Sequence, residues 1–243
     1  MRAGTTLCFG LTPTIVGTSG PDSVLYGTER TDVIVGLGGN DYINAKGGND
    51  FVCGGAGNDV IFGDVGRDEL SGDGGNDALG GHRHTQSGGN CSDYGVHQEP
   101  GADSGNVLRG GSGNDYLEGA NGGDTLLGED GTDCLYGMDG SDRLEGGLGG
   151  DSAHGGAGSD ALLGGEGDDR LTDWYPETSQ LLGDTDRLQG EGGNDFLDAG
   201  DGDGEDLLDG GVQLTQDLCT YDRGGAFGLF ADDVEGCETR NSV

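Results

Sequence analysis

The feature that most constrains this chain is a nine-residue repeat built from glycine, aspartate and aliphatic residues. The stretch GGAGNDVIF, Gly54 to Phe62, follows AKGGNDFVC and precedes GDVGRDELS in the same phase. Seventeen units of the form GGxGxDxUx align in this way, where U is apolar in every unit and position six is Asp in 16, Asn106 being the exception. A repeat this regular indicates a solenoid, in which one small structural unit is stacked many times.

The chemistry of one unit predicts how the units stack. Glycines permit positive φ, so GGxGxD is expected to turn tightly, and the following xUx to form a short strand. Alternate side chains of a strand face opposite ways, which places U inside and its two neighbours outside. With 58 glycines among 243 residues, little else can form a core. Two units should therefore make an 18-residue coil, and successive coils should lie about 4.8 Å apart.

This stacking places the aspartates of alternate units, such as Asp41, Asp59 and Asp77, in rows at the coil spacing. Two unit charges about 4.8 Å apart repel by roughly 1 kcal/mol in water and roughly 3 to 4 kcal/mol at an effective dielectric of 20. Summed over many pairs, the repulsion rivals the whole stability of a domain, about 5 to 15 kcal/mol. We therefore expect the roll not to fold until a divalent cation lies between the coils. Carboxylate and carbonyl oxygens on a flexible turn favour Ca²⁺ over Mg²⁺, and the turn segments contain none of the Cys or His that Zn²⁺ prefers.

The units GGAGNDVIF, GGSGNDYLE, GGAGSDALL and GGEGDDRLT resemble those of the repeats-in-toxin (RTX) family, also called hemolysin-type calcium-binding repeats. The resemblance implies an all-β fold, a right-handed parallel β-roll (β-solenoid) that holds several Ca²⁺ ions between its turns. In this family the position-six Asp and backbone carbonyls of the turn hold the metal. Carried over residue by residue, the metal-binding role falls on Asp32, Asp41, Asp50, Asp59, Asp68, Asp77, Asp115, Asp124, Asp133, Asp142, Asp151, Asp160, Asp169, Asp186, Asp195 and Asp206.

The repeats fall into three arrays separated by two interruptions of the period. We expect an N-terminal cap (1–26), a first β-roll array (27–80), an inserted loop (81–100), a second array (101–172), a second loop (173–180), a third array (181–209) and a C-terminal cap (210–243). Caps are expected because a bare end of the roll would expose strand edges.

One outward face of the first array is too apolar to be left in water. It carries Val33, Val35, Phe51 and Cys53. We therefore predict that the N-terminal segment crosses this face and that Cys8 pairs with Cys53.

The six cysteines predict an oxidising compartment and disulfides. By the same reasoning about faces, Cys91 would pair with Cys134, which leaves Cys219 for Cys237. The alternative is that some or all of the thiols are free. The N-terminal stretch lacks the continuous apolar core of a signal peptide, so we expect a secreted or cell-surface protein exported by the general route, with its leader removed.

Charge and composition restrict the partners. A net charge of −35 repels nucleic acid and anionic membranes and attracts cations such as calcium. No run of about 18 apolar residues exists, so membrane insertion is not expected. Nothing in the sequence identifies a macromolecular partner.

Catalytic motifs are not apparent. HExxH and GxSxG are absent, and the longest segment outside the arrays, 210–243, has 34 residues, too few for a catalytic domain. We therefore expect no enzyme, but a calcium-binding β-roll with a structural, adhesive or interaction role. The alternative is a small extracellular enzyme or a transition-metal site in the 81–100 loop, at His82 and His84. Trp174 and Tyr175 could bind a sugar or peptide, although a plug between stacked segments is the more ordinary role for such residues.

Overall fold

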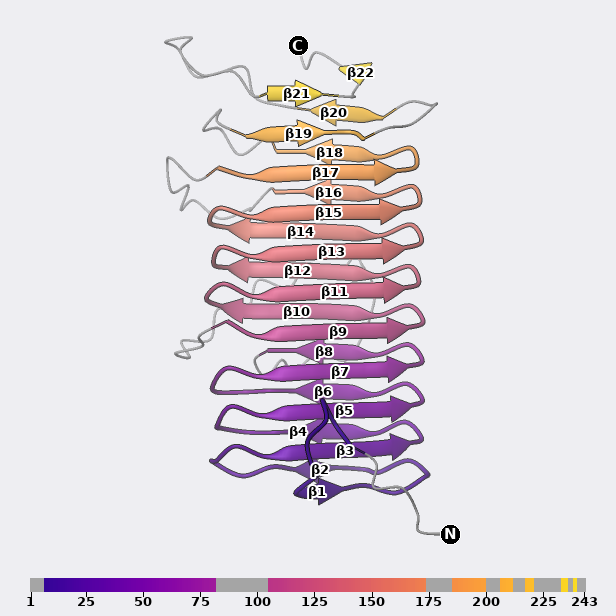
Figure 1. Cartoon of the computed structure of the whole chain (residues 1–243), viewed down its shortest axis with the longest axis vertical. Coiled ribbons are helices and arrows are strands. Elements are labelled where there is room, and N and C mark those ends of the chain that lie inside the picture. Colours follow the sequence, from indigo (N-terminus) through magenta and orange to yellow (C-terminus); the bar gives the residue numbers. More distant parts are fainter. Residues whose placement is uncertain are drawn as a thin grey trace.

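The computed structural model describes residues 7–81, 105–173, 185–199, 206–211, 217–220, 233–235 and 238–239. These residues form two parallel sheets of eleven strands each, which lie face to face along one long axis (Figure 1). The chain alternates between the two sheets, so that odd-numbered strands lie in one and even-numbered strands in the other. The described part of the chain contains no helix, and so none that is long and apolar enough to cross a membrane.

The odd sheet consists of β1 (Ile15–Val16), β3 (Val33–Gly38), β5 (Phe51–Ala56), β7 (Glu69–Gly74), β9 (Val107–Ser112), β11 (Thr125–Asp130), β13 (Arg143–Leu148), β15 (Ala161–Glu166), β17 (Arg187–Gly192), β19 (Leu207–Asp209) and β21 (Asp233–Glu235). The even sheet consists of β2 (Leu25–Tyr26), β4 (Tyr42–Asn44), β6 (Val60–Phe62), β8 (Ala78–Gly80), β10 (Tyr116–Asn121), β12 (Cys134–Asp139), β14 (Ser152–Ala157), β16 (Arg170–Thr172), β18 (Phe196–Asp198), β20 (Leu218–Thr220) and β22 (Glu238–Thr239).

The strand register follows the predicted coil of 18 residues. Val33 pairs with Phe51, and Thr125 with Arg143. Strand pairing also continues across the two sequence interruptions, because β7 before the first pairs with β9 after it, and β15 before the second pairs with β17 after it. The predicted all-β parallel β-roll is therefore confirmed. The predicted boundaries of caps, arrays and loops stay predictions, although β1, β2, β21 and β22 extend the two sheets at either end of the stack.

A single file of apolar side chains forms the core. All 17 position-eight residues are at most 1% exposed, from Ile34 to Leu208. Beside Leu144, by contrast, Arg143 is exposed and Glu145 is half-buried. The predicted in-and-out alternation is thus confirmed in this strand, whereas β3 and β12 also bury the neighbours of their position-eight residues.

Many strands are longer than the three residues expected. β3 runs past the aliphatic residue into the next unit, where Leu37 pairs with Gly55 and Gly38 with Ala56. Backbone donors and acceptors of the coil need partners wherever water is excluded. The neighbouring coil supplies them beyond the aliphatic position, so the ladder extends into the first residues of the turn.

The N-terminal segment covers the apolar face as predicted. Cys8 and Cys53 form a disulfide, and they pack with Val33 and Val35 in a small buried cluster. The ring of Phe9 lies 6.2 Å from that of Phe51 within this cluster. In Figure 1 the indigo N-terminal stretch crosses the first strands of the roll.

The other predicted pairings cannot be followed to both ends. Cys134 and Cys219 each take part in a disulfide, but their predicted partners, Cys91 and Cys237, lie outside the described residues. The pairings Cys91–Cys134 and Cys219–Cys237 stay predictions. His82, His84, Trp174 and Tyr175 also lie outside the described residues.

The turn glycines differ in how much a side chain would disturb them, which gives a matched test of the stacking. Gly57 has a φ of 133°, and a Cβ there would collide with the carbonyl oxygen of Gly39 in the preceding coil. We expect Gly57→Ala to lower the free energy of unfolding by about 1–3 kcal/mol or more, from backbone strain and the collision together. At Gly38 the nearest atom to a Cβ is 3.5 Å away, so Gly38→Ala should change the free energy of unfolding by less than about 1 kcal/mol. Denaturant unfolding measures both, and equal stabilities for the two variants would contradict this account of the turns.

Candidate metal centre

The position-six side chains form two rows, one before the even strands and one before the odd strands. In each row a residue donates its backbone N–H to the Oδ1 of the residue one coil further along. The N–O distances are 2.7 to 3.1 Å, apart from the bond from Asn106 to Asp124, which belongs to the same series. The even row is Asp22, Asp41, Asp59, Asp77, Asp115, Asp133, Asp151, Asp169, Asp195 and Asp217. The odd row is Asp32, Asp50, Asp68, Asn106, Asp124, Asp142, Asp160, Asp186 and Asp206.

The structure thus brings all sixteen predicted aspartates into the two rows. None of the sixteen is more than 6% exposed. Each row places negative charges at the coil spacing, as the sequence predicts, and does so away from water. Whether these residues can hold a metal depends on the second carboxylate oxygen, Oδ2, and on its hydrogen-bond partners.

Apart from the first member of each row, the Oδ1 of each carboxylate accepts the hydrogen bond along the row, whereas Oδ2 is often left without a hydrogen-bond partner. Within the described ranges, buried Oδ2 atoms with no hydrogen-bond partner belong to Asp41, Asp50, Asp59, Asp77, Asp115, Asp133, Asp142, Asp151, Asp169 and Asp195. A buried carboxylate oxygen without a donor or cation is costly, and so regular a set calls for a common ligand.

Position-one glycines leave the space that such a ligand would need. A Cβ on Gly137 would lie 2.5 Å from Asp142 Oδ2 and 2.5 Å from the carbonyl oxygen of Gly155 in the next coil. The same two distances recur at Gly128, with Asp133 Oδ2 and the carbonyl oxygen of Gly146. Each opening is therefore lined by a carboxylate oxygen and a backbone carbonyl oxygen. These are hard donors on a turn, the type of ligand that Ca²⁺ takes.

Burial shifts the ionisation of the rows. Loss of solvation raises the pKa of Asp50 to about 6, of Asp77 to about 7 and of Asp142 to about 8. The backbone hydrogen bond along the row lowers each pKa and neighbouring carboxylates raise it, but desolvation is the largest cause. Without a cation, Asp77 and Asp142 would therefore be partly protonated near neutral pH.

Asn106 shows what a neutral residue does in a row. Its Oδ1 accepts the backbone N–H of Asp68 at 2.8 Å, so the hydrogen-bond series passes through it unbroken. Its buried Nδ2 has no hydrogen-bond partner among the described residues, and lies where the other units place an oxygen, beside Gly81. The charge of an aspartate is thus not needed for stacking itself.

Three further aspartates were missed by the sequence reasoning. Asp22 and Asp217 extend the even row at its two ends. A sequence signal exists for Asp22, which ends the repeat-like stretch GTSGPD, whereas Asp217 is recognised only by its place in the stack. Asp173 is different, since it follows β16 at position one of a unit, where glycine is expected.

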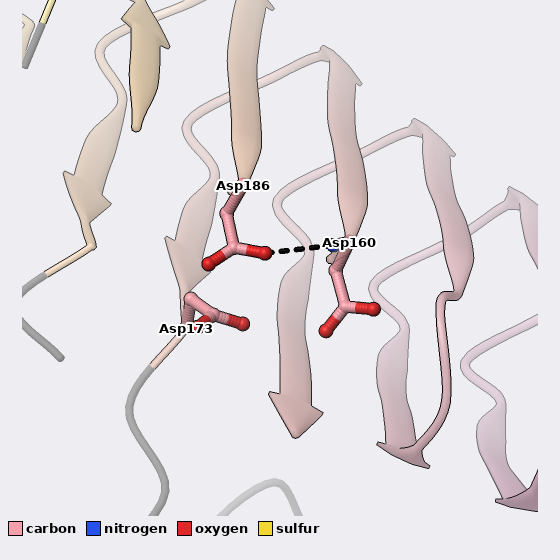
Figure 2. A group of neighbouring side chains, drawn as sticks. All are labelled: Asp160, Asp173 and Asp186. Atoms are coloured by element: carbon pink, nitrogen blue, oxygen red, sulfur yellow. Dashed lines mark hydrogen bonds between the residues drawn. The ribbon is translucent and has the colours of Figure 1, made fainter. Parts of the chain in front are cut away.

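Asp173 joins Asp160 and Asp186 in a buried group (Figure 2). One carboxylate oxygen from each lies within 4.8 Å of the others. Asp173 and Asp186 lie at the two ends of the connection between β16 and β17, and Asp160 directly precedes β15.

Comparison with known proteins agrees with this geometry. A family model described as the RTX calcium-binding nonapeptide repeat (4 copies) matches residues 26–61, 47–79, 100–135, 136–171 and 182–213. These segments cover more than half of the chain. The chain belongs to the RTX calcium-binding repeat family. RTX repeats bind calcium, and the buried rows with their oxygen-lined openings fit that ion, so this is a calcium-binding β-roll protein.

A solved structure with partial similarity is the solution structure of the AlgE6R3 subunit from the Azotobacter vinelandii mannuronan C5-epimerase. It is 33% identical, with a TM-score of 0.27, over 40% of this chain and 52% of that one. The chain thus spans about half the length of that subunit, and the likeness supports no argument about activity. Among curated proteins, none matches this chain significantly.

The raised pKa values predict how the metal-free RTX roll responds to pH. The pKa values of Asp50, Asp77 and Asp142 in the folded state exceed the unfolded value of 3.8. The folded form therefore binds more protons than the unfolded form between about pH 4 and pH 8. The contribution of these groups is fully present below about pH 4 and is lost as the pH rises to about 8. We expect metal-depleted protein to be more stable to denaturant at pH 5 than at pH 8, measured by circular dichroism.

Asp142→Asn is the matched control, because Asn keeps the hydrogen bond of the row and does not titrate. The stability of the metal-depleted Asp142→Asn variant to denaturant should depend less steeply on pH than that of the wild-type protein. Metal-depleted wild-type protein that is more stable at pH 8 than at pH 5 would show that these carboxyl groups do not behave as buried acids.

Proposed function

We propose that this chain is a secreted β-roll that folds when it meets Ca²⁺ outside the cell, and that it serves there in a structural, adhesive or interaction role. The observation that carries the proposal is the set of buried Oδ2 atoms without partners along both rows. Sixteen position-six aspartates, Asp32 to Asp206, would supply carboxylate ligands, and turn carbonyls would complete the coordination. Bound Ca²⁺ would neutralise the rows and link neighbouring coils.

Coupling of binding to folding follows from where the ligands come from. Asp142 and the carbonyl of Gly155 belong to different coils, and they meet only once those coils have stacked. An unfolded chain lacks such a site, so the free energy of binding contributes directly to folding. Extracellular calcium modules commonly bind with dissociation constants of about 10⁻⁴ to 10⁻³ M, which would keep the roll unfolded before export.

The cysteines support the extracellular part of the proposal. Cys8 and Cys53 form a disulfide with each other. Cys134 and Cys219 each take part in a disulfide as well. Disulfides persist in oxidising compartments and are rare in the cytosol.

His154, the histidine within the described ranges, supports a role other than catalysis. Its ring stacks on that of Tyr136 at a centroid distance of 4.9 Å. Burial lowers the pKa of His154 to about 4, with the charge of Arg170 adding to the shift. A neutral, stacked imidazole is suited to packing on the outside of the roll rather than to proton transfer at neutral pH.

A calcium titration followed by far-UV circular dichroism tests the proposal. In EGTA at pH 7.5 the protein should give a spectrum poor in β structure, because burying the rows at that pH makes the carboxylates either repel one another as anions or take up protons at a cost in free energy. Adding Ca²⁺ should produce a cooperative rise in β signal, which the same concentration of Mg²⁺ should not reproduce. A β spectrum that is already complete in excess EGTA and does not change with Ca²⁺ would sink the proposal.

A variant and an elemental analysis sharpen this experiment. Asp133→Asn should shift the titration midpoint to higher Ca²⁺, because one buried carboxylate ligand is lost while the row hydrogen bond remains. Elemental analysis of the purified full chain separates the alternative at His82 and His84, which requires a stoichiometric transition metal.

A further inference from the structure

Asp173 breaks the rule that position one is glycine. It directly follows β16, and Gly155 occupies the equivalent place 18 residues earlier. In the regular coils at Gly119, Gly128 and Gly137, the opening at position one is lined by one carboxylate oxygen and one backbone carbonyl oxygen. Asp173 therefore adds a side chain where the other coils offer only backbone.

The opening at Gly155 consequently has a different lining. A Cβ on Gly155 would lie 2.5 Å from Asp160 Oδ2, and closer still to Asp173 Oδ1. Gly156 donates its backbone N–H to Asp173 Oδ1 at 3.2 Å, which fixes the carboxylate in place. Here a second carboxylate oxygen replaces the backbone carbonyl of the regular opening.

Asp186 brings a third carboxylate to the same place. Its Oδ1 accepts the backbone N–H of Asp160 at 2.7 Å. Asp160, Asp173 and Asp186 are 3%, 2% and 0% exposed. Figure 2 shows the three side chains gathered at the ends of neighbouring strands, with Asp173 entering from the end of β16. Within the described ranges, no other three carboxylate, His or Cys groups come this close.

An independent observation one coil away points to a cation at this edge. Asp142, the preceding member of the odd row, is 3% exposed, and its Oδ2 has no hydrogen-bond partner among the described residues. That oxygen faces the carbonyl oxygen of Gly155 across the opening at Gly137. A buried acceptor aimed at another acceptor is stabilised only by a cation or a proton between them.

We propose that Asp160, Asp173 and Asp186 form a three-carboxylate Ca²⁺ site that binds more tightly than the sites of the regular coils and fills first. The inference rests on the proposed calcium-dependent function. Calcium affinity rises with the number of charged ligands and with the rigidity of the site, and this site has one more carboxylate than two stacked position-six aspartates supply. Asp173 and Asp186 also flank residues 174–184, so an ion here joins the coils on either side of that interruption.

Calcium binding to the full chain, measured by isothermal titration and by competition with a chromophoric chelator, tests the site. The wild-type protein should show about one ion bound about tenfold or more tightly than the remainder. Asp173→Gly, which restores the residue of regular coils, and Asp173→Asn, which keeps the shape, should both abolish this tight class and leave the weaker sites. Asp142→Asn should instead weaken a regular site and leave the tight class in place.

The outcomes of this experiment distinguish a failure of the three-carboxylate site from a failure of the proposed calcium-dependent function. Wild-type protein that binds no Ca²⁺ would refute the proposed function as a whole. Calcium binding with a tight class that survives in both Asp173 variants would refute only the three-carboxylate site. Both variants should reach the wild-type circular dichroism spectrum at saturating Ca²⁺, because the other sites still fill. Failure of both to form the roll there would assign Asp173 to folding instead of calcium binding and would also overturn the inference.

Discussion

The hydrogen bond from the backbone N–H of one position-six residue to the Oδ1 of the next is the interaction on which this architecture depends. It holds each coil in register with its neighbour, and it does so by bringing carboxylates together away from water. One oxygen of these aspartates therefore stabilises the stack, while at positions such as Asp133 and Asp142 the other is buried without a hydrogen-bond partner among the described residues. Asn106 keeps the same hydrogen bond without a charge. The charge of the sixteen aspartates is thus not required for stacking itself, and the proposed binding of Ca²⁺ would account for it.

The thin core is in keeping with the proposed dependence of folding on a cation. Each strand buries one aliphatic side chain at position eight, which contributes about 1.5–3 kcal/mol when fully buried. Against this gain stands the conformational entropy lost in ordering nine residues per unit, many of them glycines, which lose the most freedom. Backbone hydrogen bonds and contacts between coils reduce the difference, but no large central core exists to absorb the repulsion along the rows.

The nine-residue period was sufficient to predict most of the fold and most of the site. It determined which residues face inward, and the apolar outward residues Val33 and Val35 revealed where the N-terminal segment lies. It could not identify Asp173 or Asp217, because membership of a site there depends on the stacking of coils and not on a count along the chain. Asp217 lies 22 residues after its row neighbour Asp195, although the regular step is 18. Asp173 has no counterpart at position one in any complete repeat except Asp201, which lies outside the described residues.

The spacing of the rows is independent of the length of chain between their members. Steps of 18, 20, 22, 26 and 38 residues all end in the same backbone-to-Oδ1 bond. Closing a longer connection costs little, since each doubling of a flexible loop adds only about 0.6 kcal/mol. The step from Asp160 to Asp186 is less than twice the regular one, so by this estimate its greater length adds less than about 0.6 kcal/mol. A roll held together in this way can accept insertions at its edge, provided that the carboxylates on either side still meet.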